Sequence, residues 1–404
     1  MLGKKFHSLP AETRRSIWNF SYCFKAKGYE CFLIGGSCRD LLLGETPHDF
    51  DFATNCPLPV TKTLFPRVIP TGESHGTLSI PFGSHMFEVT RYRKDVATDG
   101  RHATIVFSDS IEEDQQRRDM RINSLAYDAI DERVVDSQGG LEDFAAKIVR
   151  FVGDAETRVL EDHLRAVRFV RMIAKLQPFG FGYDPNEMDR AVAVFDAGKL
   201  SLERVYEEIA KINRIGDRDK AFCAEILARL NIFAPYFAKA TQARAVARSV
   251  MDTESLFPLY CEFRKTHSLK KTAAVLKLTR RRKRILDLLQ RHSTDDLSRG
   301  TQAKRMLSQI APADMEETAE AFSAVCGRNL KERFQRILSS KEPFRLSDLA
   351  ISGNDLKKLG YAEKRLGEAL RLLQEHVWKK PDDNLPKILR QLAKSYRSQA
   401  VCRN

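Results

Sequence analysis

Two aspartates, Asp49 and Asp51, are separated by a single residue near the start of the chain. The segment Phe50–Ala53 alternates like a β-strand, so both carboxylates should point to one face and Phe50 and Phe52 to the other. Two oxygen ligands side by side suit Mg²⁺, which binds through one or two carboxylates together with substrate phosphates. Because Asp-x-Asp also occurs on ordinary surface strands, the residues around this pair must decide whether it is a metal site.

A glycine pair lies upstream of the aspartates. Gly35 and Gly36 allow close approach of a ligand to the backbone. A short helix is expected directly behind them, with Ser37 as its cap, and a helix start can cradle phosphate. Arg39 adds a guanidinium donor to the same segment. The combination predicts a site for a phosphate group beside a metal ion.

Four further segments follow in order, and they are Arg117-Arg-Asp-Met-Arg-Ile-Asn123, Asp136–Asp143, Glu161-Asp-His-Leu-Arg165 and Ser201–Ile209. Together with the carboxylate strand they resemble the five motifs of class II (bacterial-type) tRNA nucleotidyltransferases. These are the CCA-adding enzymes, which are related to poly(A) polymerases within the superfamily typified by DNA polymerase β. Ile351–Gly360 resembles a tail segment of the same enzymes, so the resemblance covers nearly the whole chain.

The resemblance implies template-independent addition of C and A, from CTP and ATP, to the 3′ end of tRNA with release of pyrophosphate. It implies Mg²⁺ as cofactor, with Asp49 and Asp51 as metal ligands and Glu88 as a third catalytic carboxylate. Taken alone, Glu88 would be an exposed strand residue. Arg121 departs from the family pattern, which commonly has a small hydroxyl residue there. The expected nucleotide-binding residues in the first two motifs are Gly35, Gly36, Ser37, Arg39, Arg118, Asp119 and Asn123, the last two on an expected helix.

The fourth motif offers two interpretations. On an expected helix over 156–175, Asp162 and Arg165 share a face, and Arg168 and Arg171 continue the ridge toward the triphosphate. One interpretation is a salt bridge on a solvated helix face. The other is a Watson–Crick edge made of protein, in which the carboxylate accepts from the amine of C or A and the guanidinium donates to the ring. U and G would mismatch both groups, at about 1–3 kcal/mol for each unpaired polar group.

The segment 91–102 is charged and contains glycine, which is typical of a mobile loop between a strand and a helix. In the family, a loop at this place is needed to switch specificity from C to A. The other interpretation is an ordinary hydrophilic connection.

The pattern of the chain predicts an α+β fold. The front contains an expected helix over 15–28, a strand over 29–35 and a hairpin turning at 82–85, whereas 122–129 suggests a helix. From about residue 142 only helical segments are expected. The resemblance then implies a mixed-sheet nucleotidyltransferase head over 1–143, followed by an all-helical neck over 144–235, body over 236–310 and tail over 311–404.

The net charge of +13 over 404 residues is uneven. Residues 1–150 are near neutral, so the basic excess lies in the helical rear, which is expected to meet a polyanion such as tRNA. A nuclear-localisation signal is the other interpretation of the run at 280–284. The expected RNA-binding residues are Lys270, Lys271, Arg280, Arg281 and Arg282.

Composition excludes several classes of protein. No apolar stretch approaches the roughly 18 residues of a transmembrane helix, and the first residues lack the apolar run of a signal peptide, so we expect no membrane partner. Eight scattered cysteines without a Cys-x-x-Cys pair favour reduced thiols in the cytoplasm and give no zinc site. No obligate protein partner is inferred.

Three alternative functions share these motifs. An enzyme that adds only the terminal A would have the same catalytic residues. A poly(A) polymerase usually carries a basic segment after the carboxylate strand, and 68–77 looks like the tRNA enzymes instead. A non-catalytic RNA-binding module would not need the intact acidic residues at 49, 51, 88 and 162.

Overall fold

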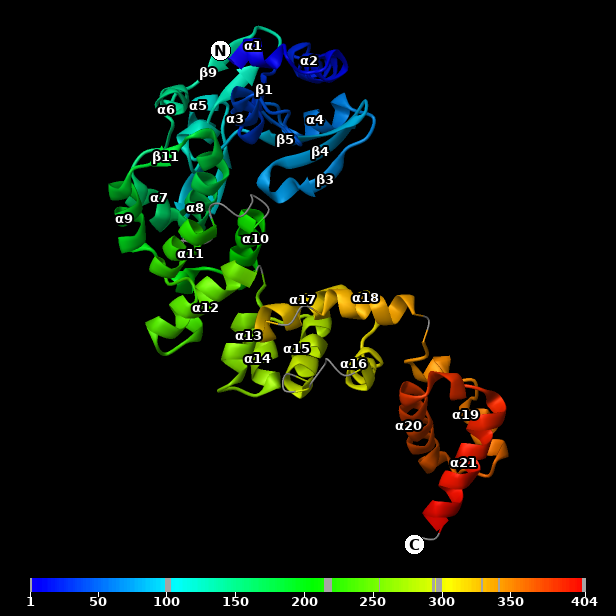
Figure 1. Ribbon diagram of the computed structural model, residues 1–404. Helices are drawn as coiled ribbons and strands as arrows, with labels where there is room; N and C mark the ends of the chain where they lie inside the picture. Colours follow the sequence, from blue (N-terminus) through cyan, green and yellow to red (C-terminus); the bar gives the residue numbers. More distant parts are fainter. Residues whose placement is uncertain are drawn as a thin grey trace. The chain divides into compact units, whose positions relative to one another are not determined.

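The computed structural model describes residues 2–98, 103–213, 220–253, 255–292, 295, 300–327, 330–340 and 342–401. The chain divides into two compact units, Met1–Asp252 and Thr253–Asn404 (Figure 1). The four-part division into head, neck, body and tail is finer than these two units and stays a prediction.

The first unit is built on a seven-stranded mixed sheet with the strand order β3-β4-β5-β2-β1-β8-β9. Its central strands β2 and β5 are parallel, and the other neighbours are antiparallel. The predicted mixed-sheet head is therefore confirmed. The strands are β1 (Cys31–Ile34), β2 (Phe50–Thr54), β3 (Ile69–Gly72), β4 (Thr77–Phe82), β5 (His85–Arg91), β8 (Ala126–Asp128) and β9 (Arg133–Val135).

Aromatic side chains fasten helix α2 (Ala11–Lys25) to the centre of this sheet. The ring of Phe20 lies 4.7 Å from that of Phe52 and 4.9 Å from that of Phe87. Phe52 is fully buried, whereas Asp51, next to it on β2, is only partly buried. The alternation predicted for this strand is confirmed, because burying the phenylalanines turns Asp51 to the opposite face.

Two expectations for the front of the chain are wrong. Residues 122–129 do not form a helix but a 3-10 turn, η2 (Arg121–Asn123), and the strand β8, because Ala126 and Tyr127 pair with β1. Asp119 and Asn123 therefore do not share a helix. The predicted loop also contains structure, since β6 (Arg93–Thr98) pairs with β7 (Ala103–Phe107), whose β-branched residues favour a strand. Residues 99–102 of that loop lie outside the described residues.

Helices pack beside the sheet within the first unit. Contrary to the expectation of helices alone after residue 142, the short strands β10 (Ile148–Val149) and β11 (Gly182–Tyr183) pair in parallel. The helices of this unit are α1 (Leu2–Phe6), α3 (Gly36–Leu43), α4 (Leu58–Leu64), α5 (Ile111–Gln116), α6 (Gly140–Ala146), α7 (Ala155–Glu161), α8 (Leu164–Leu176), α9 (Pro185–Val194), α10 (Leu202–Asn213), α11 (Lys220–Arg229) and α12 (Ala240–Thr253).

The second unit is helical throughout its described residues. Its last three helices share an apolar cluster that includes Leu356, Leu373 and Leu389. Among the helices that the structure describes, none has the length and apolar character that a membrane span requires. The helices are α13 (Phe257–Arg264), α14 (Leu269–Val275), α15 (Arg280–His292), α16 (Gly300–Leu307), α17 (Met315–Cys326), α18 (Lys331–Ser339), α19 (Gly353–Lys358), α20 (Glu363–Lys379) and α21 (Pro386–Val401).

Candidate active site

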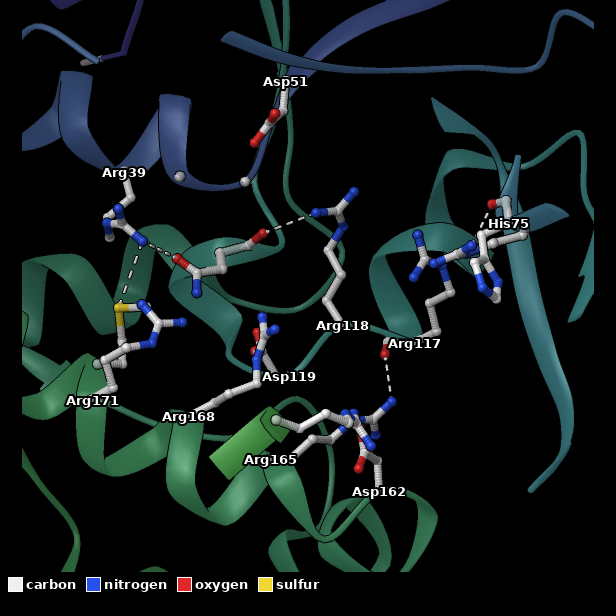
Figure 2. A pocket seen from close by; sticks show the side chains of 16 residues that line it. Arg39, Asp51, His75, Arg117, Arg118, Asp119, Asp162, Arg165, Arg168 and Arg171 are labelled. Atoms are coloured by element: carbon white, nitrogen blue, oxygen red, sulfur yellow. Dashed lines mark hydrogen bonds and ion pairs between the residues drawn. The ribbon is translucent and has the colours of Figure 1, made fainter. Parts of the chain in front are cut away.

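A cavity of about 690 Å³ opens in the first unit, between the start of α3, the strand β2 and the helices α8 and α10 (Figure 2). Eight arginines and three aspartates are among its lining residues, so its wall carries excess positive charge. The sequence-predicted residues that line it are Gly35, Gly36, Arg39, Asp51, Arg118, Asp119, Asn123, Asp162, Arg165, Arg168 and Arg171.

Three predicted residues, Ser37, Asp49 and Glu88, are not part of that lining. Glu88 on β5 is the register partner of Asp51 on β2, and Asp49 directly precedes β2. The side chains of Asp49 and Glu88 are exposed. Both acids are near enough to Asp51 for their charge to act on it, whereas Asp51 alone of the three lines the cavity.

The electrostatics of this group favour a cation. Burial raises the pKa of Asp51 to about 6, and the negative charges of Glu88 and Asp49 add to the rise against the opposing effect of Arg118. A bound cation would relieve this repulsion. Within the described part of the chain, no three acidic, histidine or cysteine side chains converge closely enough to hold a metal ion by themselves. The donor set thus fits an ion such as Mg²⁺, which takes further ligands from phosphates and water.

Ser37 connects the glycine pair to the carboxylate strand. Its hydroxyl donates to the carbonyl oxygen of Asp49 at 3.0 Å and accepts the N–H of Asp51 at 3.1 Å. The prediction that Ser37 caps α3 is wrong, because the helix begins two residues earlier, at Gly36, and Gly35 is its N-cap. Gly35 has a φ of 66°, which a side chain would disfavour, and a Cβ there would lie 3.4 Å from Nη1 of Arg118.

Acidic residues hold the arginines of the cavity wall in place. Although burial opposes it, Arg168 lowers the pKa of Asp119 to about 2, and the two side chains lie 2.6 Å apart. Arg171 pairs with the buried Glu208 and lowers the pKa of that carboxyl below its usual range, against the effect of burial. The side chains of these arginines are already held in one orientation at the cavity wall, so they lose little conformational entropy when an anion binds.

Arg39 is held in a different way, by neighbouring polar groups. Its Nη1 donates to Oδ1 of Asn123 at 2.8 Å, and its Nη2 lies 2.7 Å from Oδ1 of Asp40. The residue is 6% exposed, so these partners replace water as the acceptors for its guanidinium N–H groups. Asn123 thus orients Arg39.

The fourth motif does not form one helix. The backbone leaves the helical conformation at Asp162, with φ −152° and ψ 106°, so Asp162 and Arg165 do not share a helix face as predicted. The cause is local, because Oδ1 of Asp162 accepts the N–H of Leu164 at 3.1 Å and so starts a new helix, α8. Both side chains nevertheless line the cavity (Figure 2).

The partners of these two residues fix their positions. Oδ2 of Asp162 accepts from Nη2 of Arg204 at 2.7 Å, and a carboxylate retains further lone pairs for a base amine. Arg165 pairs with Glu161, and its Nη2 donates to the carbonyl oxygen of Arg117 at 3.0 Å. The carboxylate and the guanidinium are thus anchored from behind, as a rigid recognition edge requires.

Sequence reasoning missed several lining residues, namely His75, Arg93, Arg117, Met172 and Arg204. Arg204 and Glu208 belong to the fifth motif and are four residues apart on α10, and this spacing could have indicated that both face α8. Arg117 stands in the second motif beside Arg118. Arg93 belongs to the charged segment 91–102, whereas nothing in the sequence singles out His75 or Met172.

The expected RNA-binding residues all belong to the second unit. Lys270 and Lys271 on α14 and Arg280 at the start of α15 are exposed. Arg281 lies 2.7 Å and Arg282 3.4 Å from carboxylate oxygens of Glu317, on α17. Their charge therefore serves, at least in part, to join α15 to α17.

Comparisons with protein families, known sequences and solved structures identify proteins that resemble this chain. The model of the poly A polymerase head domain matches residues 31–150. The human protein named CCA tRNA nucleotidyltransferase 1, mitochondrial, is 30% identical over 393 residues, covering 93% of this chain and 88% of that protein. A CCA-adding enzyme of Lactobacillus johnsonii is 36% identical over 199 residues, covering 48% and 49% of the two chains. The crystal structure of the Bacillus stearothermophilus CCA-adding enzyme in complex with CTP superposes with a TM-score of 0.75 at 25% identity, covering 96% of this chain and 99% of that one.

Proposed function

The chain belongs to the CCA tRNA nucleotidyltransferase family, and we propose that it adds C and A, from CTP and ATP, to the 3′ end of tRNA without a nucleic-acid template. The observation that carries this proposal is that one cavity is lined by Asp51 of the carboxylate strand, by a wall of anchored arginines and by the pair Asp162 and Arg165. The tRNA substrate is inferred from the human relative's name, and CTP is inferred from the Bacillus stearothermophilus CCA-adding enzyme, whose crystal structure contains CTP.

The arginines of the wall would bind the triphosphate. Arg118, Arg168 and Arg171 present guanidinium groups whose orientation is fixed by acidic partners, which suits bidentate recognition of phosphate. Gly35 and Gly36 leave the backbone at the start of α3 accessible beside them. The nucleotide would thus be held with its α-phosphate toward Asp51.

In the reaction, the 3′-oxygen of the tRNA forms a bond to the α-phosphorus while the bond to the β-phosphate oxygen breaks and pyrophosphate leaves. Asp49 and Asp51 would hold Mg²⁺, with Glu88 as the third carboxylate beside them. Bound there, Mg²⁺ supplies positive charge to the attacking and leaving oxygens. The protein otherwise positions the two reactants and stabilises the charge that develops on the phosphoryl oxygens.

Asp162 and Arg165 would read the incoming base. The carboxylate of Asp162 accepts from the exocyclic amine of C or A, and Arg165 donates to the ring acceptors beside it. U and G place an acceptor opposite Asp162 and an N–H opposite Arg165, which leaves buried polar groups unpaired. The same pair therefore admits two nucleotides and excludes the other two.

The second unit would contribute the electrostatic surface for tRNA, with Lys270, Lys271 and Arg280 as the candidate phosphate contacts.

We also propose a cytoplasmic location, because the seven cysteines in the described part of the chain are free thiols, as a reducing compartment favours.

The test uses three tRNA substrates that end before CCA, after C and after CC, with labelled CTP or ATP and Mg²⁺. We expect addition of C to the first two and of A to the third, with no further growth. Addition of A to the third substrate alone would identify an enzyme that adds only A, and long A tails would identify a poly(A) polymerase. Absence of incorporation would contradict the proposal and point to an RNA-binding module.

A further inference from the structure

One buried carboxylate outside the cavity lining anchors two of its arginines. Asp114 on α5 is 1% exposed. Its Oδ1 accepts from Nε and Nη2 of Arg117 at 2.9 and 2.7 Å, and its Oδ2 accepts from Nη2 of Arg118 at 2.7 Å. Both arginines line the cavity, whereas Asp114 lies behind the wall that they form.

A third cavity residue meets the same group. The backbone N–H of Arg93, the first residue of β6, lies 3.4 Å from Oδ1 of Asp114. The side chain of Arg93 donates to the carbonyl oxygen of His75, which also lines the cavity. Asp114 is therefore the point at which α5, the ribbon β6–β7 and the second motif converge.

The charge of Asp114 is required for this arrangement. Burial opposes ionisation, but Arg118 and Arg117 lower the pKa of Asp114 below its usual range, so the carboxylate is ionised at neutral pH. The side chains of Arg117 and Arg118 are only 17% and 14% exposed. Without a fixed anion behind them, two neighbouring guanidinium groups would repel each other and lose their common orientation.

We propose that Asp114 is a positioning residue for triphosphate binding: it aligns Arg117 and Arg118 toward the phosphates while making no contact with the nucleotide itself. This inference rests on the proposed function in that the cavity must bind a nucleoside triphosphate. It does not depend on which nucleotide is added. Because the aligned groups face phosphate, binding of CTP and of ATP should depend on Asp114 equally.

The test compares Asp114→Asn with Glu113→Gln. Glu113 is the adjacent carboxylate on α5, and it is a matched control because it bonds to Lys94 and Ser108 and is not part of the cavity lining. Calorimetry without tRNA measures the dissociation constants of CTP, ATP and inorganic tripolyphosphate, the last of which probes the phosphate site alone. Thermal unfolding of each variant is followed in parallel.

For Asp114→Asn we expect all three dissociation constants to rise by a similar factor, about 10-fold or more, as for the loss of charge-assisted hydrogen bonds. For Glu113→Gln we expect changes of less than about twofold. A lowered unfolding temperature with unchanged dissociation constants would overturn the proposal, because it would show a structural role only. A rise for one nucleotide but not for tripolyphosphate would overturn it as well, since the effect would then lie at the base.

Should Asp114→Asn fail to fold, Asp114→Glu keeps the charge and moves it by one methylene group. Because this shift should misalign the two arginines, we expect all three dissociation constants to rise a few-fold. Dissociation constants equal to those of the wild type would overturn the proposal. Failure of the wild type to extend tRNA would instead contradict the proposed function, and the calorimetric comparison would still decide the role of Asp114.

Discussion

Arginines are dense in two regions of this molecule, the cavity wall of the first unit and the start of α15 in the second. In the cavity, Arg168 pairs with Asp119 and Arg171 with Glu208, both of them buried acids. On α15, Arg281 pairs with Asp314 and Glu317. Both regions thus contain ion-paired arginines, and pairing alone does not distinguish a binding site from a structural joint.

The difference lies in the balance of charge and in the shape of the surface. The lining of the cavity contains eight arginines and three aspartates. The acids that pair with Arg117, Arg118 and Arg171 lie behind this lining, so mainly positive charge faces the space that a triphosphate would occupy. On α15, Asp314 also accepts from Arg284, and two acids serve three arginines at the contact of two helices. A basic run in a sequence therefore predicts nucleic-acid binding only if the acidic side chains that the fold brings beside it leave part of its positive charge unpaired.

The sharpest way to test the assignment of the cavity is to remove its metal ligands. Asp49→Ala and Asp51→Ala should each lower incorporation of both CTP and ATP by about a thousandfold or more, because the charge on the phosphoryl oxygens loses its stabilisation. Binding of tRNA should change little, since the contacts proposed for it belong to the second unit. Incorporation and filter binding measure the two quantities.

Asp131→Ala provides the control for that experiment, because Asp131 is an exposed acid paired with Lys25 and lies outside the cavity lining. It should retain wild-type incorporation. Residual activity within about tenfold of the wild type in either metal-ligand variant would contradict the assignment.

The second prediction concerns the choice of nucleotide. Asp162→Ala removes the acceptor that repels U and G, so discrimination against these nucleotides should relax by about 10- to 100-fold while use of C and A falls. Arg165→Ala should blur the choice as well, through loss of the donor to the ring. The measurement is relative incorporation of all four nucleotides on the same tRNA.

Asp189→Ala is the matched control, since Asp189 forms an exposed pair with Arg229 and is not among the lining residues. It should leave the nucleotide ratios unchanged. If the two variants of the fourth motif lose rate equally for every nucleotide, another part of the pocket must read the base.

The strands and the motif residues of the head could be predicted because their signals are local. Alternation placed Asp51 opposite Phe50 and Phe52, and the hairpin turning at 82–85 is found between β4 and β5. Spacing also brought Arg168 and Arg171 to one side of α8. These predictions needed only the periodicity of a single element.

The errors came from contacts between elements. Residues 122–129 have a helix-like pattern, but pairing with β1 makes part of them a strand, and tertiary pairing overrides such local preference. The acids behind the arginines, Asp114 and Glu208, were not singled out, because their role appears only when α5 and α10 are placed beside the cavity. The break at Asp162 has a local cause, since an aspartate can start a helix by accepting the N–H two residues on.

The third prediction separates function from stability at Asp51. Its pKa of about 6 lies above the ordinary value of 3.8, so the folded protein binds a proton more tightly than the unfolded chain does. Stability must then fall as pH rises through this window, by up to about 3 kcal/mol at about 1.4 kcal/mol per pKa unit. In chelator-treated protein, Asp51→Asn should therefore unfold at a higher temperature than the wild type at pH 7 and show a much smaller difference near pH 4. An equal difference at both pH values would show that the carboxylate is not destabilised by its surroundings.

The smallest expected effects come from substitutions in the second unit. They test whether the exposed lysines of α14 contribute more to tRNA binding than the ion-paired arginines of α15 do. Lys270 and Lys271 are exposed on α14, so the double variant Lys270→Ala, Lys271→Ala should lower the salt slope of tRNA binding by about one for each lost phosphate contact, without changing the unfolding temperature. Arg281 and Arg282 pair with Glu317, so Arg281→Ala with Arg282→Ala should cost about 1 kcal/mol of stability and change the salt slope less. The two variants remove the same formal charge, which makes each a control for the other. Equal loss of salt slope in both would mean that the ion pairs between α15 and α17 open when RNA binds, and the distinction between arginines that bind a ligand and arginines that join helices would then fail in this unit.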